Sequence, residues 1–234
     1  MALAPKFKAH RLVFSDAAGA TVADADPLHT VELYLDYVCP FSAKMFNTLY
    51  HAVFPALRNP HPDQHAPARR VQFLFRHQVQ PWHPSSTLVH EAGLAVQRAA
   101  AAAGRPQLFW DFSAALFRDQ RAYMDAHVVD ETRNATYKRL AALAAAATDG
   151  AVDADKVYSE LAVQPAPAPA PDNYTGPVNT GNAITDDLKV VIKMGRLVGV
   201  HVSPTVLVDG VVNNEIASSW TADQWLAWLG KSVA

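Results

Sequence analysis

A single cysteine, Cys39, is the feature that most limits how this chain of 234 residues can fold. An intramolecular disulfide needs two sulfur atoms, so no conformation of the chain contains one, and an all-cysteine metal site is excluded for the same reason. A packed core must therefore stabilise the fold. Half of the residues are apolar and 18% are charged, which is typical of a globular protein with a sizeable core. We expect one domain over residues 1–234.

The charge and the hydrophobicity pattern exclude two classes of partner. The net charge is -2 and no dense block of Lys and Arg is present, so the sequence shows no electrostatic footprint for nucleic acid or for an anionic membrane surface. No segment approaches the roughly 18 apolar residues that a membrane-spanning helix needs, and residues 1–8 lead into polar sequence without a hydrophobic signal core. We therefore expect a cytoplasmic protein that binds neither nucleic acid nor membrane.

Cys39 lies between a predicted strand and a predicted helix. Residues 30–37 alternate apolar residues with polar or aromatic ones and are rich in strand formers. Pro40 suits the first position of a helix because its φ angle is preset and it has no amide hydrogen, and residues 41–49 continue with apolar residues at helical spacing. At the predicted N-cap, the sulfur of Cys39 faces free backbone amides and the positive end of the helix dipole, which both favour the thiolate.

The rest of the chain predicts further strands and helices around this unit. Residues 71–76 read as a second strand, and residues from about 85 to 163 as a series of helices. An alternating Ala-Pro run within residues 164–182 predicts an extended linker that closes the helical segment. A helix then precedes a strand, turn and strand over residues 200–212, and residues 220–229 form a last amphipathic helix.

The order of these elements resembles the thioredoxin superfamily. A strand leads into Cys-Pro-aromatic-Ser at the start of a helix, and Ser203-Pro204-Thr205 comes much later, before a hairpin. The length of the helical segment resembles the insertion of DsbA-like proteins, and the resemblance covers about residues 28–230. It implies an α/β protein with the thioredoxin fold, in which helices flank a central mixed sheet and an all-helical insertion interrupts the chain.

The resemblance also implies roles for individual residues. Cys39 matches the nucleophilic cysteine of the family, and Pro204 matches its cis-proline. Ser203 precedes that proline and is expected to offer backbone groups to a peptide or thiol ligand. Pro40 and Phe41 complete the expected substrate-binding surface. These matches predict thiol–disulfide oxidoreductase activity with a protein or glutathione as the thiol or disulfide substrate.

Ser42 departs from the family pattern, because it stands where the second, resolving cysteine would be and leaves a CxxS motif. A resolving thiol releases the substrate by internal attack, which can be worth an effective molarity of about 10⁵ M or more. Without it, a mixed disulfide on Cys39 needs an external thiol for release, most simply glutathione as a co-substrate. We expect Ser42 to donate a hydrogen bond to the thiolate. We expect no bound cofactor and no metal, since clustered metal-ligand spacing is absent.

Three histidines are candidate bases for the thiol of Cys39, because a neighbouring imidazole can take its proton. They are His77, His83 and His90, and we favour His83, in the loop of residues 81–84 after the second strand. The sequence alone places none of them beside Cys39.

Two other functions remain open. In the first, glutathione binds and Cys39 or Ser42 assists conjugation or isomerisation, as in kappa-like glutathione transferases and their isomerase relatives, although those relatives generally have Ser at the position of Cys39. In the second, the chain is a non-catalytic peptide-binding module on a thioredoxin scaffold, which the missing resolving cysteine favours.

Overall fold

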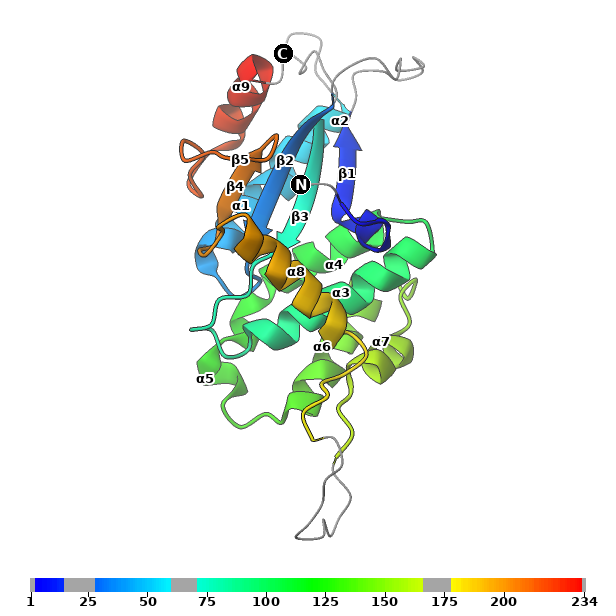
Figure 1. Cartoon of the computed structure of the whole chain (residues 1–234). Helices are drawn as coiled ribbons and strands as arrows, with labels where there is room; N and C mark the ends of the chain where they lie inside the picture. The colour runs from blue at the N-terminus through cyan, green and yellow to red at the C-terminus, as the bar shows by residue number, and fades with distance from the viewer. Residues whose placement is uncertain (1–2, 15–27, 60–70, 166–177, 233–234) are drawn as a thin grey trace.

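A five-stranded mixed sheet forms the centre of the molecule (Figure 1). The computed structural model describes residues 3–14, 28–59, 71–165 and 178–232. In these residues the strands are β1 (Arg11–Phe14), β2 (His29–Leu35), β3 (Val71–His77), β4 (Thr205–Val208) and β5 (Val211–Val212), in the spatial order β1-β3-β2-β4-β5. Strands β2 and β3 are parallel, and the other pairs are antiparallel. The central mixed sheet and the predicted strands are confirmed, although the strand expected from residue 200 begins only at Thr205 and β1 was not predicted.

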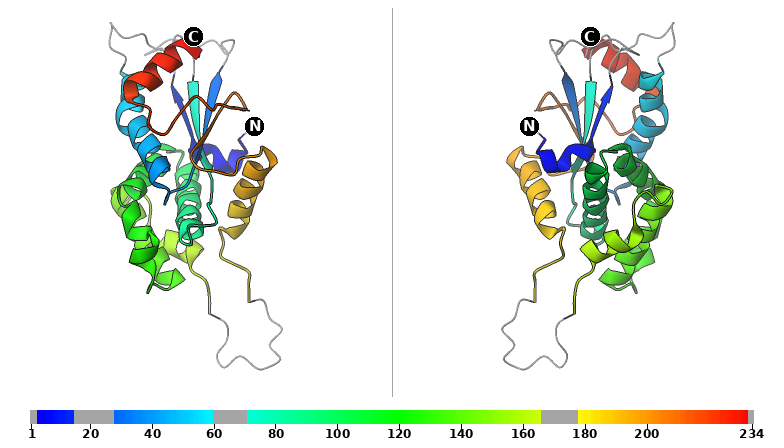
Figure 2. Two further views of the ribbon diagram at one scale, coloured as in Figure 1. Left: turned by 90° about the vertical axis from the view of Figure 1, so that its left-hand side faces the viewer. Right: turned by 90° about the vertical axis from the view of Figure 1, so that its right-hand side faces the viewer.

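Helices cover both faces of the sheet and one of its ends. They are α1 (Pro40–Thr48), α2 (Phe54–Arg58), α3 (Ser86–Ala102), α4 (Gln107–Arg118), α5 (Asp125–Val128), α6 (Arg133–Ala147), α7 (Ala154–Leu161), α8 (Thr185–Leu197) and α9 (Ala222–Ser232). Figure 2 shows α1, α2 and α9 on one face and α8 on the other. Helices α3 to α7 lie beyond the carboxyl ends of β2 and β3 (Figure 1), so the segment after β2 lies between the sheet and this helical insertion.

The core is continuous from the sheet into the insertion. On the sheet, Phe73 and Phe75 of β3 are fully buried, and so are Phe109 and Trp110 of α4. The rings of Phe75 and Phe109 meet edge to face with centroids 5.3 Å apart, which is a favourable geometry for aromatic pairs. These residues belong to one contiguous cluster of buried apolar side chains, so the insertion and the sheet bury apolar surface against each other.

The helix that starts at Pro40 runs further than the predicted 41–49. It passes through a π-helical turn, η2 (Leu49–Val53), into α2 and ends at Arg58. Pro55 explains the turn, because it has no amide hydrogen to donate inside the helix. The amide of Phe54 instead donates to the carbonyl of Leu49, one residue further back than in an α-helix.

Most of the linker predicted over residues 164–182 lies outside the described residues, since residues 166–177 are not described. Two 3-10 turns, η1 (Pro5–His10) and η3 (Gln120–Tyr123), complete the elements described. None of the helices described here is long and apolar enough to cross a bilayer.

Candidate active site

Cys39 occupies the predicted N-cap position of α1. Its amide donates to the carbonyl of Asp36 at 3.1 Å, which closes a tight turn at the end of β2, and its carbonyl accepts the amide of Ala43 at 3.1 Å. The parallel pairing of β2 and β3 carries this turn to the end of the sheet that faces the insertion. The thiol is therefore placed where the positive end of the dipole of α1 meets the carboxyl end of the central strand β2.

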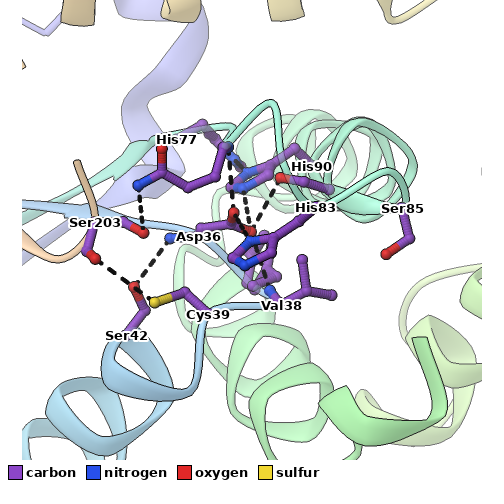
Figure 3. A network of polar contacts seen from close by, with 12 residues as sticks. Asp36, Val38, Cys39, Ser42, His77, His83, Ser85, His90 and Ser203 are labelled. Atoms are coloured by element: carbon purple, nitrogen blue, oxygen red, sulfur yellow. Dashed lines mark hydrogen bonds and ion pairs between the residues drawn. The ribbon is translucent and has the colours of Figure 1, made fainter. Parts of the chain in front are cut away.

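The loop before β4 that contains Val202, Ser203 and Pro204, here named the cis-proline loop, lies directly against the thiol. The peptide bond between Ser203 and Pro204 is cis, as the resemblance predicted, and the thiol of Cys39 donates to the carbonyl oxygen of Ser203 over 3.6 Å (Figure 3). The fold thus brings together two predicted site residues that are 164 positions apart in the chain. The Ser203 carbonyl that we expected to face a ligand is occupied by the thiol itself.

The thiol is nearly covered, whereas its sequence neighbours are exposed. Cys39 is 5% exposed, but Phe41 is 63% exposed, and Pro40 is exposed as well. In the cis-proline loop, Val202 is 49% exposed. Large exposed apolar side chains thus come from both segments that meet at the sulfur, and grouped exposed apolar side chains commonly mark interaction sites.

Ser42 does not make the hydrogen bond that we predicted. Its side chain is fully buried, and its hydroxyl oxygen accepts the amide of Asp36 at 3.2 Å (Figure 3). Within the described part of the chain, no hydrogen bond joins Ser42 to the sulfur of Cys39. The hydroxyl is used instead to satisfy a buried backbone amide in the turn before the cysteine, as buried amides require a partner.

Asp36 is the centre of the polar network at this site, although the sequence analysis gave it no role. Its buried carboxylate accepts hydrogen bonds from two backbone amides and two side chains: Val38 N at 3.0 Å, Gln80 N at 3.2 Å, Ser86 Oγ at 3.0 Å and His83 Nδ1 at 2.9 Å. A fifth contact runs to His90 Nε2 at 3.5 Å. The available signal was the position of an acidic residue at the carboxyl end of a predicted central strand.

The charge of Asp36 depends on these partners. Burial alone raises the pKa of its carboxyl group, but hydrogen bonds from His90, His83 and the Val38 amide bring the pKa below its ordinary value. A carboxylate that accepts several hydrogen bonds is stabilised in its charged form. Asp36 is therefore an ionised group beside the turn that carries Cys39.

The three candidate bases take different places around Asp36. His83 and His90 contact its carboxylate directly, whereas His77 reaches it only through His90, with a distance of 2.7 Å between their Nδ1 atoms. None of the three shares a hydrogen bond with Cys39 among the described residues. His83, which we favoured from the sequence, is the partly exposed one, and its neighbour Trp82 is 60% exposed.

Two glutamines that the sequence did not single out connect the site to its surroundings. Gln80 donates from Nε2 to the hydroxyl of Ser203 at 3.0 Å, and this bond connects the Asp36 network to the cis-proline loop. Gln120 in η3 donates to the carbonyl of Tyr37 at 2.8 Å and lies 3.4 Å from that of Cys39. The insertion thus holds the turn in place from the other side. Within the described residues, no set of three or more His, Cys, Asp or Glu is arranged to hold a metal ion.

Comparisons with known proteins support the fold. No protein-family model and no curated protein matches the sequence. Among solved structures, a candidate protein-disulfide isomerase from Pseudomonas syringae is 22% identical with a TM-score of 0.60, and the match covers 86% of this chain and 93% of that one. DsbA from Mycobacterium tuberculosis is 16% identical with a TM-score of 0.57, covering 96% of this chain and 93% of that one.

A third neighbour leads to the same conclusion. BdbD from Bacillus subtilis is 19% identical with a TM-score of 0.53, over 94% of this chain and 91% of that one. Each match spans the sheet and the helical insertion together, since it covers most of both chains. The chain therefore has the thioredoxin fold, with a helical insertion, that is found in DsbA-like proteins.

Proposed function

We propose that this protein is a thiol–disulfide oxidoreductase that acts through Cys39 by a monothiol mechanism. The observation that carries the proposal is the position of the sulfur, which lies at the N-cap of α1 and 3.6 Å from the carbonyl of Ser203 in the cis-proline loop. A thiol at a helix N-terminus is favoured as a nucleophile. The DsbA-like structural neighbours make disulfide substrates the natural class to test.

The mechanism has two exchanges. The thiol of Cys39 gives up its proton and its sulfur attacks one sulfur of a substrate disulfide, so that a bond forms between the two sulfurs while the substrate's own S–S bond breaks. The leaving sulfur takes the electron pair and that proton. An external thiol such as glutathione then gives up its proton and attacks the mixed disulfide at the substrate sulfur, and the sulfur of Cys39 leaves with the electron pair and takes up this proton. The net reaction exchanges one disulfide for another. It leaves the protein unchanged.

The exposed side chains around the site suggest the character of the substrate. Phe41, two residues after Cys39, and Val202, next to Ser203, are exposed apolar side chains, so a disulfide flanked by apolar groups fits this surface better than a highly charged one. Ser42 contributes by holding the amide of Asp36 in the turn. We propose the cytoplasm as the location, because release by glutathione needs a reducing thiol pool.

A burst experiment tests the proposal. With a chromogenic aromatic disulfide and no other thiol, the wild-type protein is expected to release about one equivalent of aromatic thiolate and to retain the other half as a mass adduct, because Cys39 cannot resolve it. Turnover is expected only after glutathione is added. Cys39→Ser serves as the control that removes the burst. A burst no faster than the reaction of free cysteine would refute the proposal.

The coverage of the thiol favours one alternative, a binding module without catalysis. Cys39 is 5% exposed, and thiol reactivity requires access. If this alternative holds, the burst is absent, and a peptide with apolar side chains binds wild type and Cys39→Ser with the same affinity. If the oxidoreductase proposal holds, a disulfide-containing peptide is captured covalently by the wild type and not by the variant.

A further inference from the structure

A chain of three buried histidines leads from the first turn of the protein to Asp36. His10 in η1 is 3.1 Å from His77, between their Nε2 atoms, and His77 at the end of β3 is 2.7 Å from His90, between their Nδ1 atoms. The other ring nitrogen of His90 lies 3.5 Å from Asp36 Oδ1 and has no nearer partner in the described residues. All three rings are at most 2% exposed, so bulk solvent does not reach their nitrogens.

The carboxylate of Asp36 determines the direction of the hydrogen bonds that connect the three histidines. A neutral imidazole carries one hydrogen, so one ring nitrogen donates and the other accepts. If His90 Nε2 carries the hydrogen, it points at the carboxylate, and its Nδ1 accepts from His77. His77 Nε2 then accepts from His10. The opposite arrangement would aim a buried lone pair at a carboxylate, which is unfavourable in a low-dielectric environment.

The surroundings keep His10 and His77 neutral, as this arrangement requires of these two rings. Burial lowers the pKa of His10 to about 3, assisted by the charge of Arg76 on β3 and opposed by that of Asp187 on α8. Burial likewise lowers the pKa of His77 well below its ordinary value, and the adjacent His10 and His90 lower it further. At neutral pH the rings of His10 and His77 therefore carry one hydrogen each.

His83 binds the other oxygen of the Asp36 carboxylate. Its Nδ1 donates to Asp36 Oδ2 at 2.9 Å, so a neutral His83 has its unprotonated nitrogen at Nε2. That atom has no hydrogen-bond partner among the described residues, and the side chain is 26% exposed. Figure 3 shows His83 and Cys39 in the same cluster around Asp36.

We propose that His90, supported by the hydrogen bonds of His77 and His10, is a positioning residue that holds the carboxylate of Asp36 in place. Asp36 in turn orients His83, which accepts the proton of the attacking thiol during disulfide exchange at Cys39 and passes it to the leaving sulfur. This inference rests on the proposed function. In the attack step, the thiol proton passes to His83 Nε2 and then to the leaving sulfur. In the release step, the proton of the external thiol passes to His83 and then to the sulfur of Cys39, so the protons balance.

The tautomers can be measured without any activity. Long-range ¹H–¹⁵N spectra of the full chain at neutral pH distinguish the protonated ring nitrogen of each histidine, and single His→Gln variants assign the signals. We expect the hydrogen on Nε2 of His90, Nδ1 of His77 and Nε2 of His10. A charged ring at any of the three, or a hydrogen on Nδ1 of His90, would overturn the directed chain. This result stands even if Cys39 proves unreactive, so the two proposals fail separately.

Rates of disulfide exchange test the role of the histidines around Asp36. Replacing His83 by Gln is expected to slow exchange about 100-fold at about pH 7, the lower end of the usual contribution of acid–base groups. His90→Leu removes the donor to Asp36 and is expected to cost about tenfold, whereas His90→Gln keeps a donor and an acceptor and should stay within about threefold of wild type. These losses should shrink at high pH, where solvent ionises the thiol without help.

The control is His127→Gln, because His127 is an exposed residue of α5 outside the network. This variant should leave the rate of disulfide exchange unchanged at every pH. Equal losses for His90→Leu and His90→Gln at every pH, together with lowered melting temperatures, would show a purely structural role for His90 and overturn the proposal. A rate for His83→Gln that equals the wild-type rate would overturn it as well.

Discussion

At the scale of single residues, Ser42 decides which kind of thiol chemistry is open to this chain. Its hydroxyl is buried and accepts the amide of Asp36, so the residue has a structural task at the position where a resolving cysteine would act. The chain therefore has one sulfur beside the cis-proline loop and a polar group, without nucleophilic capacity of its own, three residues later. Under the proposed function, release of a substrate therefore depends on a second molecule.

The variant Ser42→Cys tests this directly. It places a second thiol three residues after Cys39, and we expect it to release the aromatic half of a mixed disulfide without glutathione, because internal attack gains a large effective molarity. Mass spectrometry should show that the adduct of the wild type no longer accumulates. An adduct that persists in the variant would mean that the two sulfurs are not within reach of each other.

Ser42→Ala is the matched control, since it removes the hydroxyl and adds no thiol. The adduct should accumulate as in the wild type. The buried amide of Asp36 loses its acceptor, so the free energy of unfolding should fall by about 1–3 kcal/mol. Urea denaturation measures that loss independently of the chemistry.

Sequence reasoning found the residues of the site that have a motif and missed those that act through geometry. Cys39 and Pro204 stand in recognisable local patterns, so their places at the site were predictable, and the structure brings their segments together. Asp36, Gln80 and Gln120 stand in no pattern. Their function comes from which loops meet at the end of the sheet, and that depends on packing across distant segments.

At the scale of secondary-structure elements, a buried carboxylate fastens the insertion to α8. Glu91 on α3 is 1% exposed at its side chain and accepts hydrogen bonds from the hydroxyls of Tyr137 and Thr185, on α6 and α8 respectively. Arg133 of α6 contacts it at 3.1 Å. One side chain thus connects three helices from different parts of the chain.

Removing this carboxylate should loosen the contact of the insertion with α8. Glu91→Leu removes the carboxylate acceptor of the Tyr137 hydroxyl and the Arg133 guanidinium, and leaves the Thr185 hydroxyl with Asn182 Oδ1 at 3.2 Å. We expect the free energy of unfolding to fall by about 2–4 kcal/mol, as for a broken buried polar network. The control is Asp186→Ala, which breaks the exposed pair with Lys189 and should cost at most about 1 kcal/mol. Similar losses in both variants would show that Glu91 does not have this clamping role.

A glycine on α3 sets how closely this helix approaches β3 and the turn after β2. A Cβ atom at Gly93 would lie 2.9 Å from Cε2 of Tyr37 and 3.1 Å from Cε1 of His77, and both side chains are buried. Helix propensity alone would favour alanine by about 1 kcal/mol. Overpacking of rigid rings costs about 1–3 kcal/mol, so the clash is the larger effect.

We therefore expect Gly93→Ala to lower the melting temperature despite the gain in helix propensity. The shift of His77 should also disturb its hydrogen bonds to His10 and His90, which would appear as changed ring signals in the ¹H–¹⁵N spectrum. The comparison is Gly104→Ala at the end of the same helix, where nothing lies within 4 Å but the φ angle of +66° disfavours a side chain. That variant should be destabilised through its backbone, without any change in the histidine signals.

The elements themselves were largely readable from the sequence, and their limits were not. The hydrophobic spacing predicted four of the five strands and the main helices, because each has a regular period, but β1 was not predicted. The helix after Pro40 was predicted to stop at residue 49, yet it continues to Arg58 because a π-helical turn accommodates Pro55. Local patterns do not report such an adjustment, which is sustained by the burial of Phe54 and Leu57.

At the scale of the whole molecule, the buried histidines make the free energy of unfolding depend on pH. The pKa of His10 falls from 6.5 to about 3 in the folded protein because of burial, with a further contribution from Arg76 that Asp187 opposes. Between these two pH values the unfolded chain binds a proton at this residue that the folded chain does not bind. The free energy of unfolding must therefore decrease as the pH falls through this window, by up to about 1.4 kcal/mol per pH unit for one group. His77 acts in the same direction.

Asp36 extends this loss to lower pH. Its folded pKa lies below the ordinary 3.8, so its stabilisation is complete above that value and is lost as the pH falls through the lowered folded pKa. The histidines therefore govern the first part of acid unfolding, and the carboxylate adds to it only below about pH 4. Urea denaturation at a series of pH values from about 7 to about 4 isolates the contribution of the histidines.

The variant His10→Phe should separate this effect from general acid sensitivity. Phenylalanine can keep the ring contacts with Phe7 and Phe109, but it cannot bind a proton, so we expect the slope of stability against pH to fall by up to about 1.4 kcal/mol per pH unit. Its absolute stability at neutral pH should also drop somewhat, because His77 loses a donor. His127→Gln, which changes an exposed residue outside the network, should leave the slope as it is. An unaltered slope in His10→Phe would mean that His10 does not remain neutral in the folded protein.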